Sequence, residues 1–307
     1  MGTAKEVLDS LRGLDGPTVL ALVEKFPDGR DGVRAVLRGE KEIVLKDAVC
    51  VLVDKNGRCI PAHLGVTSAV CDENRDFRVK QPYMNYAEIS GRFIEFFPAG
   101  TKFVEVNELR DRAEAAKERF LKDALVANLF KRAHLLLPLP QHQVSDYGIS
   151  LQEFFLPAAK AAYKQKFPER QFKNYRDGDL VGNFTVVPDV GHEKLLATMA
   201  ESPGVCWYFP HPLQGFSVQA QREAMAALLE QGLLLAGVIE PALGIVGFPE
   251  TMAGSFNTPG YDCPAVNWQS AGNSFFFEAN DDELYCNDTG NLGRAHDIYS
   301  GGLVLLG

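Results

Sequence analysis

The first candidate for a chemical role is His211, whose imidazole side chain lies between two prolines. It directly follows a predicted strand over residues 204–209. Pro212 favours an extended backbone at His211, and ligand sites in open α/β sheets gather at the carboxyl ends of strands. We therefore expect His211, together with Gln214 and Ser217, to face a cleft. A loop histidine bonded to the backbone is the alternative interpretation.

Cys206 precedes His211 in the same segment, and cysteine–histidine pairs serve as nucleophile and base in some enzymes. A reactive thiolate needs a helix N-terminus or a cation beside it, whereas Cys206 falls inside the predicted strand. Alternation along that strand places Cys206 and Tyr208 on one face and Trp207 and Phe209 on the other. We interpret Cys206 as a buried strand cysteine.

Polar and aromatic side chains gather in the glycine-rich tail, residues 254–307. Such side chains on loops are typical of recognition surfaces, although a loop layer that only covers a sheet is the alternative. His296 and Asp297 are adjacent, and we do not expect them to form an oriented dyad, because successive side chains diverge in a strand. The candidate catalytic residues are His211, Asp262 and His296, and the candidate binding residues are Gln214, Asn257, Tyr261 and Trp268.

Two clusters contain residue types that bind metals. Cys50, Cys59, His63 and Cys71 are compatible with zinc, but a predicted hairpin separates them too far for a single site. The acidic stretch 278–288 offers oxygen ligands, but its spacing does not match an EF-hand, and Asn-Asp-Asp is ordinary turn chemistry. We predict no metal site and no cofactor.

Basic and aromatic residues alternate over residues 163–176, a pattern that can bind single-stranded nucleic acid. The chain as a whole carries a net charge of −9, which opposes attraction to phosphate backbones and anionic membranes. A basic surface over buried aromatics is therefore favoured over nucleic-acid binding.

The composition is that of a globular protein, with 307 residues, 46% of them hydrophobic and 23% charged. The N-terminus has no apolar signal core, and the longest apolar region, residues 233–248, is interrupted by Glu240 and Pro241. We expect a cytoplasmic protein with reduced cysteines. Motifs of the common nucleotide-binding, hydrolase and zinc-protease classes do not occur in the sequence.

Hydrophobic spacing predicts the elements that must position these residues. We expect short helices before residue 40, a strand over 42–45, a hairpin turning at Asp54–Gly57, and a β region over 88–106 with a turn at Pro98–Thr101. In the tail, strands over 274–279 and 283–286 are predicted to join at a hairpin turn, Asn280–Asp282. A long helix is predicted over Asn107–His134, with Asn107 as N-cap. Pro138 and Pro140 suggest a domain boundary after it, and alternating strands and helices over 180–248 indicate a partly parallel sheet.

The predicted fold class is α+β. An N-terminal helix-plus-antiparallel-sheet unit, residues 1–137, packs on a C-terminal α/β sandwich with a mixed sheet, residues 138–307. The favoured function is a non-catalytic binding or protein-interaction module with a protein or small-molecule partner. A hydrolase-type enzyme with a cleft near His211 and the C-terminal loops is the first alternative, and single-stranded nucleic-acid binding through 163–176 is the second. Whether the protein is an enzyme is left open.

Overall fold

The computed structural model describes residues 15–24, 28–38, 40, 51–77 and 79–307. Contacts within the chain divide it into two units, Met1–Val49 and Cys50–Gly307. In the first unit, helices α2 (Gly16–Glu24) and α3 (Gly29–Leu37) confirm the short helices expected there. A strand predicted over residues 42–45 lies outside the described residues.

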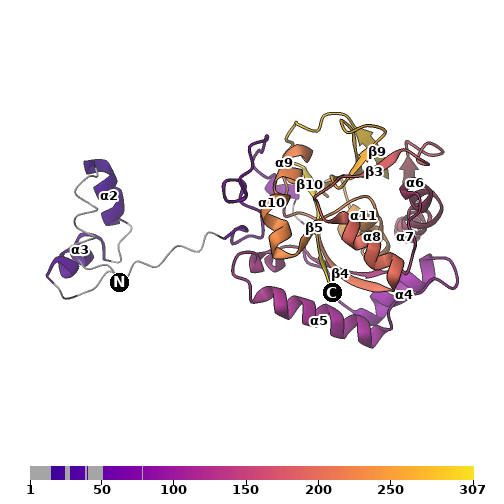
Figure 1. Ribbon diagram of the computed structural model, residues 1–307, viewed down its shortest axis with the longest axis horizontal. Coiled ribbons are helices and arrows are strands. Elements are labelled where there is room, and N and C mark those ends of the chain that lie inside the picture. The colour runs from indigo at the N-terminus through magenta and orange to yellow at the C-terminus, as the bar shows by residue number, and fades with distance from the viewer. Residues whose placement is uncertain (1–14, 25–27, 39, 41–50, 78) are drawn as a thin grey trace. The chain divides into compact units, whose positions relative to one another are not determined.

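A four-stranded sheet forms the centre of the second unit (Figure 1), and its strands are buried almost throughout. Its order is β1-β4-β11-β5, and each neighbouring pair is antiparallel. Continuous apolar runs such as Leu233–Leu235 are expected of strands covered on both faces. The strands are β1 (Leu135–Leu139), β4 (Gly204–Phe209), β5 (Leu233–Leu235) and β11 (Leu303–Leu306).

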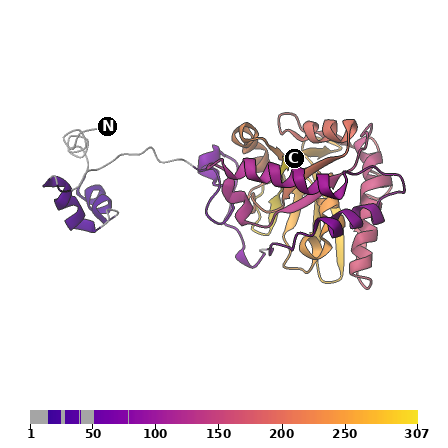
Figure 2. The ribbon, with the colours of Figure 1, turned by 90° about the horizontal axis from the view of Figure 1, so that it is seen from below.

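Helix α5 (Val106–Leu121) covers one face of this sheet, and Figure 2 shows it running across the body. The Trp207 indole Nε1 donates a hydrogen bond to the carbonyl oxygen of Ala113, 2.9 Å away, and the rings of Phe209 and Phe120 stack. Trp207 and Phe209 therefore share the face toward α5, as the predicted alternation requires.

Helix α5 is shorter than predicted. It begins at Val106 with Glu105 as N-cap, so the prediction of Asn107 as N-cap is wrong. It also ends at Leu121 rather than His134, because the Asp123 carboxylate accepts a hydrogen bond from the backbone N–H of Leu125 and turns the chain. A short 3-10 helix, η3 (Ala127–Lys131), and strand β1 follow.

The β region predicted over 88–106 is wrong, because helix α4 (Tyr86–Phe96) forms in its first half and residues 97–105 form no strand. The Asn85 side chain accepts hydrogen bonds from the N–H groups of Ala87 and Glu88 and caps this helix. Ile89 and Phe93 are buried at helical spacing. The cap and this spacing outweigh the β-branched and aromatic composition on which the strand prediction was based.

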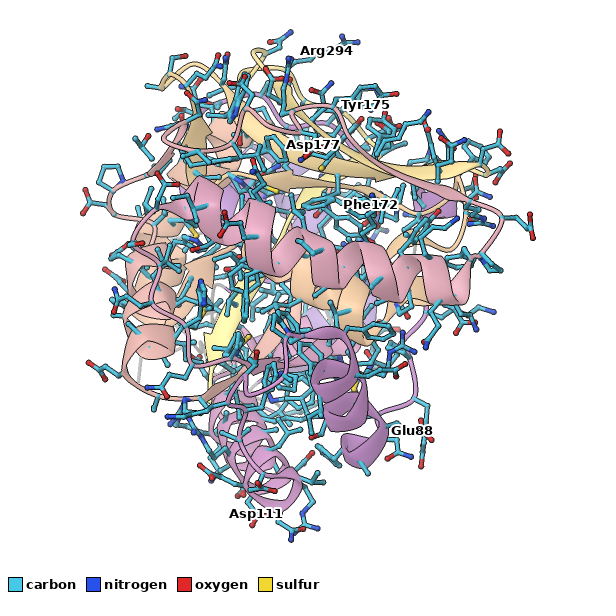
Figure 3. All side chains as sticks on the ribbon, turned by 90° about the vertical axis from the view of Figure 1, so that its right-hand side faces the viewer. Glu88, Asp111, Phe172, Tyr175, Asp177 and Arg294 are labelled. Carbon is cyan, nitrogen blue, oxygen red and sulfur yellow. The ribbon has the colours of Figure 1, made fainter. Side chains whose placement is uncertain are left out.

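Further helices surround the sheets. Figure 3 shows α7 lying between helix α4, which carries Glu88, and the strand that carries Phe172. The helices are α6 (Tyr147–Ser150), the π-helical turn η4 (Leu151–Phe155), α7 (Leu156–Lys166), α8 (His192–Glu201), α9 (Val218–Glu223), α10 (Met225–Leu228), α11 (Ile239–Gly247) and α12 (Pro249–Ala253), with 3-10 turns η1 (Pro61–Leu64), η2 (Arg75–Phe77) and η5 (Leu229–Gln231).

A second, five-stranded sheet is mixed, in the order β10-β6-β8-β9-β2. The β10–β6 and β2–β9 pairs are parallel and the others antiparallel. The hairpin predicted around Asn280–Asp282 is confirmed by β8 and β9. The strands are β2 (Gln171–Asn174), β6 (Gly260–Cys263), β8 (Ser274–Ala279), β9 (Glu283–Thr289) and β10 (Tyr299–Gly301), and β3 (Phe184–Val186) pairs separately with β7 (Val266–Trp268).

The fold is therefore α+β, with mixed and antiparallel sheets. The predicted boundary between residues 137 and 138 falls inside strand β1, whose five residues all pair with β4. Contacts instead divide the chain after Val49. Among the described residues, no helix combines the length and apolar character needed to cross a bilayer.

Candidate functional site

A hollow of about 190 Å³ lies where the mixed sheet meets the start of helix α9, and we name it the Asp262 pocket. Strand pairing brings its parts together, because Asp262 on β6 pairs with Phe276 on β8 and with Gly301 on β10. Its walls are partly aromatic and partly polar. The lining residues are Phe216, Val218, Asp262, Phe276, Thr289, Asn291, Arg294, His296 and Tyr299.

The Asp262 carboxyl group is held in place by Gln221. The Gln221 amide nitrogen donates to Asp262 Oδ2 at 2.7 Å and also to the carbonyl oxygen of Phe216 at 2.9 Å. This approach needs a glycine at position 301, since a Cβ there would lie 2.2 Å from the Gln221 oxygen. The carboxyl orientation is thus fixed before any ligand binds.

Burial raises the pKa of Asp262 to about 7, while the hydrogen bond from Gln221 acts in the opposite direction. Both protonation states are therefore populated near neutral pH. A carboxyl group of this kind can donate a hydrogen bond as the acid and accept one as the carboxylate, which suits ligand binding and general acid–base chemistry alike.

The Tyr299 ring forms a rigid wall of the pocket. Its hydroxyl group donates to the Glu278 carboxylate, which also accepts from Tyr285 at 2.5 Å. Burial, then Glu278, raises the pKa of Tyr299, so its phenol stays neutral. The Phe276 and His296 rings lie 5.8 Å and 5.5 Å from it, centroid to centroid. These contacts fix the aromatic side of the hollow.

Arg294 and His296 lie at the exposed mouth of the pocket, and Figure 3 shows Arg294 at the edge of the molecule. Arg294 forms no ion pair within the part of the chain that the structure describes. His296 Nδ1 lies 3.3 Å from Asp297 Oδ1. The expectation that these adjacent side chains diverge is therefore wrong, because they lie in a turn before β10 and not in a strand.

His211 lies apart from Asp262 and His296. It is 2% exposed, and its ring packs on Tyr261 with centroids 5.5 Å apart. Burial, followed by the charge of Arg132, holds the pKa of His211 well below its usual range, so the imidazole is neutral. The structure thus brings two of the three candidate catalytic residues together, and His211 lines a different hollow.

None of the four candidate binding residues lines the Asp262 pocket. The buried Gln214 amide donates to the carbonyl oxygens of Asn74 and Asp297 and so anchors the turn that carries His296. Tyr261 is buried, and Asn257 is exposed. Trp268 is 3% exposed and lies beneath the Arg176 guanidinium.

Sequence reasoning missed Phe216, Tyr299 and Arg294. Arg294 had a usable signal, as a lone cation in a tail rich in glycine and asparagine. Phe216 and Tyr299 had none, because only strand pairing brings such distant positions to one hollow. Ser217, predicted beside His211, instead caps helix α9 by accepting a hydrogen bond from Ala220 N–H at 3.2 Å.

The metal-compatible clusters have other partners. His63 Nδ1 bonds the carbonyl oxygen of Val51, Cys59 is buried, and Cys50 lies outside the described residues. In the acidic stretch, Glu283 pairs with Lys173 and Asp288 with Arg176. Over the described ranges, no group of three or more histidine, cysteine or acidic side chains is placed to hold a metal ion.

Ion pairs and hydrogen bonds involve most of the basic side chains of residues 163–176, including Lys173 and Arg176. Lys166 pairs with Glu250, and Lys164 donates to the carbonyl oxygens of Pro168 and Arg170. Tyr163 is fully buried. Few cations or aromatic rings of this segment are therefore available to contact a nucleic acid, which argues against nucleic-acid binding there.

A buried polar network lies away from both hollows. The Tyr147 hydroxyl oxygen lies 3.1 Å from His192 Nε2, and His192 Nδ1 lies 3.2 Å from Glu240 Oε1. Glu240 Oε2 accepts from the Gly237 N–H, and the Tyr147 hydroxyl from that of Val238. The network connects α6, α8 and α11, and its three side chains are buried and line neither the Asp262 pocket nor the hollow beside His211. The sign of this buried network in the sequence is Glu240, which interrupts the apolar region over residues 233–248.

No family model matches the chain, and no curated protein or solved structure matches it either.

Proposed function

We propose that this protein binds a small, single-ring molecule with an anionic substituent in the Asp262 pocket. The observation that carries the proposal is the combination, in one hollow, of a fixed buried carboxyl group, three aromatic side chains and, at the mouth, an arginine that forms no ion pair with any described residue. The hollow measures about 190 Å³. An engineered apolar cavity of roughly 150 Å³ holds benzene, so a substituted ring fits in size.

The chemistry of the walls defines the ligand. Phe216, Phe276 and Tyr299 suit a planar ring, and the Arg294 guanidinium suits a carboxylate or similar anion. Asp262 suits a hydroxyl group at the far end of the ring, which can donate to or accept from it. This is the small-molecule form of the binding function predicted from the sequence. A cytoplasmic location also stays a prediction.

A protein partner is less well supported. Over the residues that the structure describes, the exposed large apolar side chains come from separate elements, whereas an interface needs a contiguous patch. The exposed residues are Leu20, Tyr83, Ile94, Leu121, Ile149, Tyr175, Val181 and Phe256.

Titration calorimetry with 4-hydroxybenzoate tests the proposal, because this probe has a ring, a carboxylate and a hydroxyl group. We expect saturable binding that Arg294→Gln weakens about tenfold, a loss of about 1.4 kcal/mol. Arg110→Gln is the matched control, since Arg110 is an exposed arginine on α5 paired with Asp111. Equal affinity of wild type and Arg294→Gln, or no binding at millimolar concentration, would refute this ligand class.

The hydrolase alternative keeps one specific observation, which is that Asp262 and His296 line the same pocket. An acid with a pKa near 7 and an imidazole at hydrogen-bonding reach of a bound ester could act as general acid and base. A panel of 4-nitrophenyl esters tests this alternative. Hydrolysis that Asp262→Asn and His296→Gln both abolish would support it, and hydrolysis unchanged in both variants, or none at all, would exclude it.

A further inference from the structure

A second hollow of about 240 Å³ lies beside His211, and we name it the His211 pocket. Four chain segments meet there: the turn after Val53, the segment near residue 80, the end of η3 and the loop after β4 that carries His211. Val79 and Ala133 give the hollow a small apolar part, and its other lining residues are polar or positively charged. They are Lys55, Asn56, Gln81, Lys131, Arg132 and His211.

The His211 pocket is positively charged, although the chain carries a net charge of −9. Lys55 and Lys131 are exposed and form no ion pair within the described ranges. The Arg132 guanidinium pairs with Glu73 and also donates to the carbonyl oxygen of His211 at 2.8 Å. No carboxylate lines the hollow. Two ammonium groups are therefore left without a compensating charge.

The backbone around the His211 pocket is tightly connected. Gly57 has a φ of +82°, and a Cβ there would lie 2.8 Å from the Cβ of Arg132, so turn and η3 can meet only at a glycine. The Asn128 amide donates to the carbonyl oxygen of Val53 at 3.1 Å, and the Cys59 N–H donates to that of Pro212 at 2.8 Å. A site framed this firmly loses little conformational entropy when it binds.

Gln81 and His211 add neutral polar groups to this frame. The Gln81 amide both donates to and accepts from the backbone of His134, which holds its side chain at the wall. His211 Nε2 is buried and has no hydrogen-bond partner in the described structure. His211 is one of the residues that line the hollow, and buried polar atoms are normally paired, so a polar ligand that reached Nε2 would supply the missing hydrogen bond.

We propose that the His211 pocket binds the phosphoryl group of a small phosphate monoester. The two unpaired lysines match a charge of about −2, which a monoester carries near neutral pH and a carboxylate does not. The Arg132 guanidinium beside them is already bound by Glu73 and by the His211 carbonyl oxygen, so the two lysines carry the recognition of the phosphoryl oxygens. The hollow has room for a small organic group in addition to the phosphoryl group. This site is independent of the ligand proposed for the Asp262 pocket.

Phosphorus NMR titration of the full chain with inorganic phosphate and with glycerol 3-phosphate tests the inference. Neither probe has a ring, so neither matches the aromatic walls of the other hollow. We expect saturable binding of glycerol 3-phosphate that the double variant Lys55→Ala/Lys131→Ala weakens about tenfold, since it removes two charge-assisted hydrogen bonds to the phosphoryl oxygens.

The control is Lys122→Ala/Lys194→Ala, which removes the same charge from exposed positions on other elements. Unchanged affinity in the Lys55/Lys131 variant, or an equal loss in the control, would overturn the inference. Arg294→Gln separates the two sites: if it alone weakens phosphate binding, the anion occupies the Asp262 pocket and the His211 pocket is not its site. Circular dichroism should show all variants folded, because the substituted lysines are exposed.

Discussion

At the scale of single residues, Asp262 shows how packing changes the chemistry of a side chain. The residue is 7% exposed, and its carboxyl group accepts a hydrogen bond from Gln221. A carboxylate with full solvation or several donors would stay ionised at neutral pH. One donor in a nearly dry site does not compensate for lost hydration, and the pKa of Asp262 rises to about 7.

This pKa shift predicts a pH-dependent stability. The pKa of an unfolded aspartate is 3.8 and that of folded Asp262 is about 7, so the folded state binds more protons between these values. The free energy of unfolding should therefore fall as the pH rises from about 4 to about 7, by on the order of 4 kcal/mol from this group. Asp262→Asn removes that contribution, so its stability relative to wild type should increase from pH 5 to pH 8 in urea unfolding.

Asp111→Asn is the control for this measurement, because Asp111 is an exposed carboxylate on α5, as Figure 3 shows. Its stability relative to wild type should change little over the same range. If the Asp262→Asn and wild-type curves run parallel from pH 5 to pH 8, Asp262 does not titrate in the folded protein as proposed.

The sequence predicted which kinds of residue form the site better than it predicted which residues lie together. Asp262 and His296 could be selected as candidates because polar and aromatic side chains on glycine-rich loops are typical of recognition surfaces. His211 was grouped with them by the rule for strand ends, but it packs inward on Tyr261. Which of these residues share a hollow depends on the pairing of β6 with β8 and β10, and local sequence does not encode that pairing.

At the scale of elements, the contact between α5 and β4 carries much of the central packing. Phe120 is 5% exposed and packs against Phe130 and Phe209, whereas the next residue, Leu121, is 47% exposed. The two positions therefore compare a buried and an exposed side chain on the same helical turn.

Phe120→Ala should lower the free energy of unfolding by about 3–5 kcal/mol, because it removes apolar contact and leaves a cavity. Leu121→Ala should lower it by about 0.5 kcal/mol or less. Urea unfolding at neutral pH measures both. Similar losses in the two variants would mean that α5 does not pack on β4 through this face.

Local signals predicted some elements and failed at others for identifiable reasons. The predicted turn at Asn280–Asp282 and the predicted alternation of side chains between the two faces of β4 are confirmed, since both depend on neighbouring residues. In place of strand β1, Pro138 suggested a domain boundary. It is an edge strand, however, and a proline is tolerated there because its missing N–H would face away from the partner strand. Edge position is a property of the whole sheet.

At the scale of the whole molecule, the C-terminal end of the chain contributes residues to the hydrophobic core, whereas the described residues before Leu52 do not belong to the contiguous core. Among the residues that the structure describes, the contiguous core extends from Leu52 to Leu305. Strand β11, close to the C-terminus, pairs with β4 on one side and β5 on the other. The last strand of the chain thus joins two strands that are themselves distant in sequence.

This asymmetry predicts opposite results for two truncations. A chain of residues 50–307 should keep the thermal midpoint of the full protein within about 2 °C, because it retains the contiguous core and all of both main sheets. A chain that stops at residue 302 should lose cooperative unfolding, because β4 and β5 would each expose an unpaired edge where the buried β11 had been. Differential scanning calorimetry of both chains checks the prediction. A large drop in midpoint for 50–307, or a native-like transition for 1–302, would show that the stability of this fold is distributed differently along the chain.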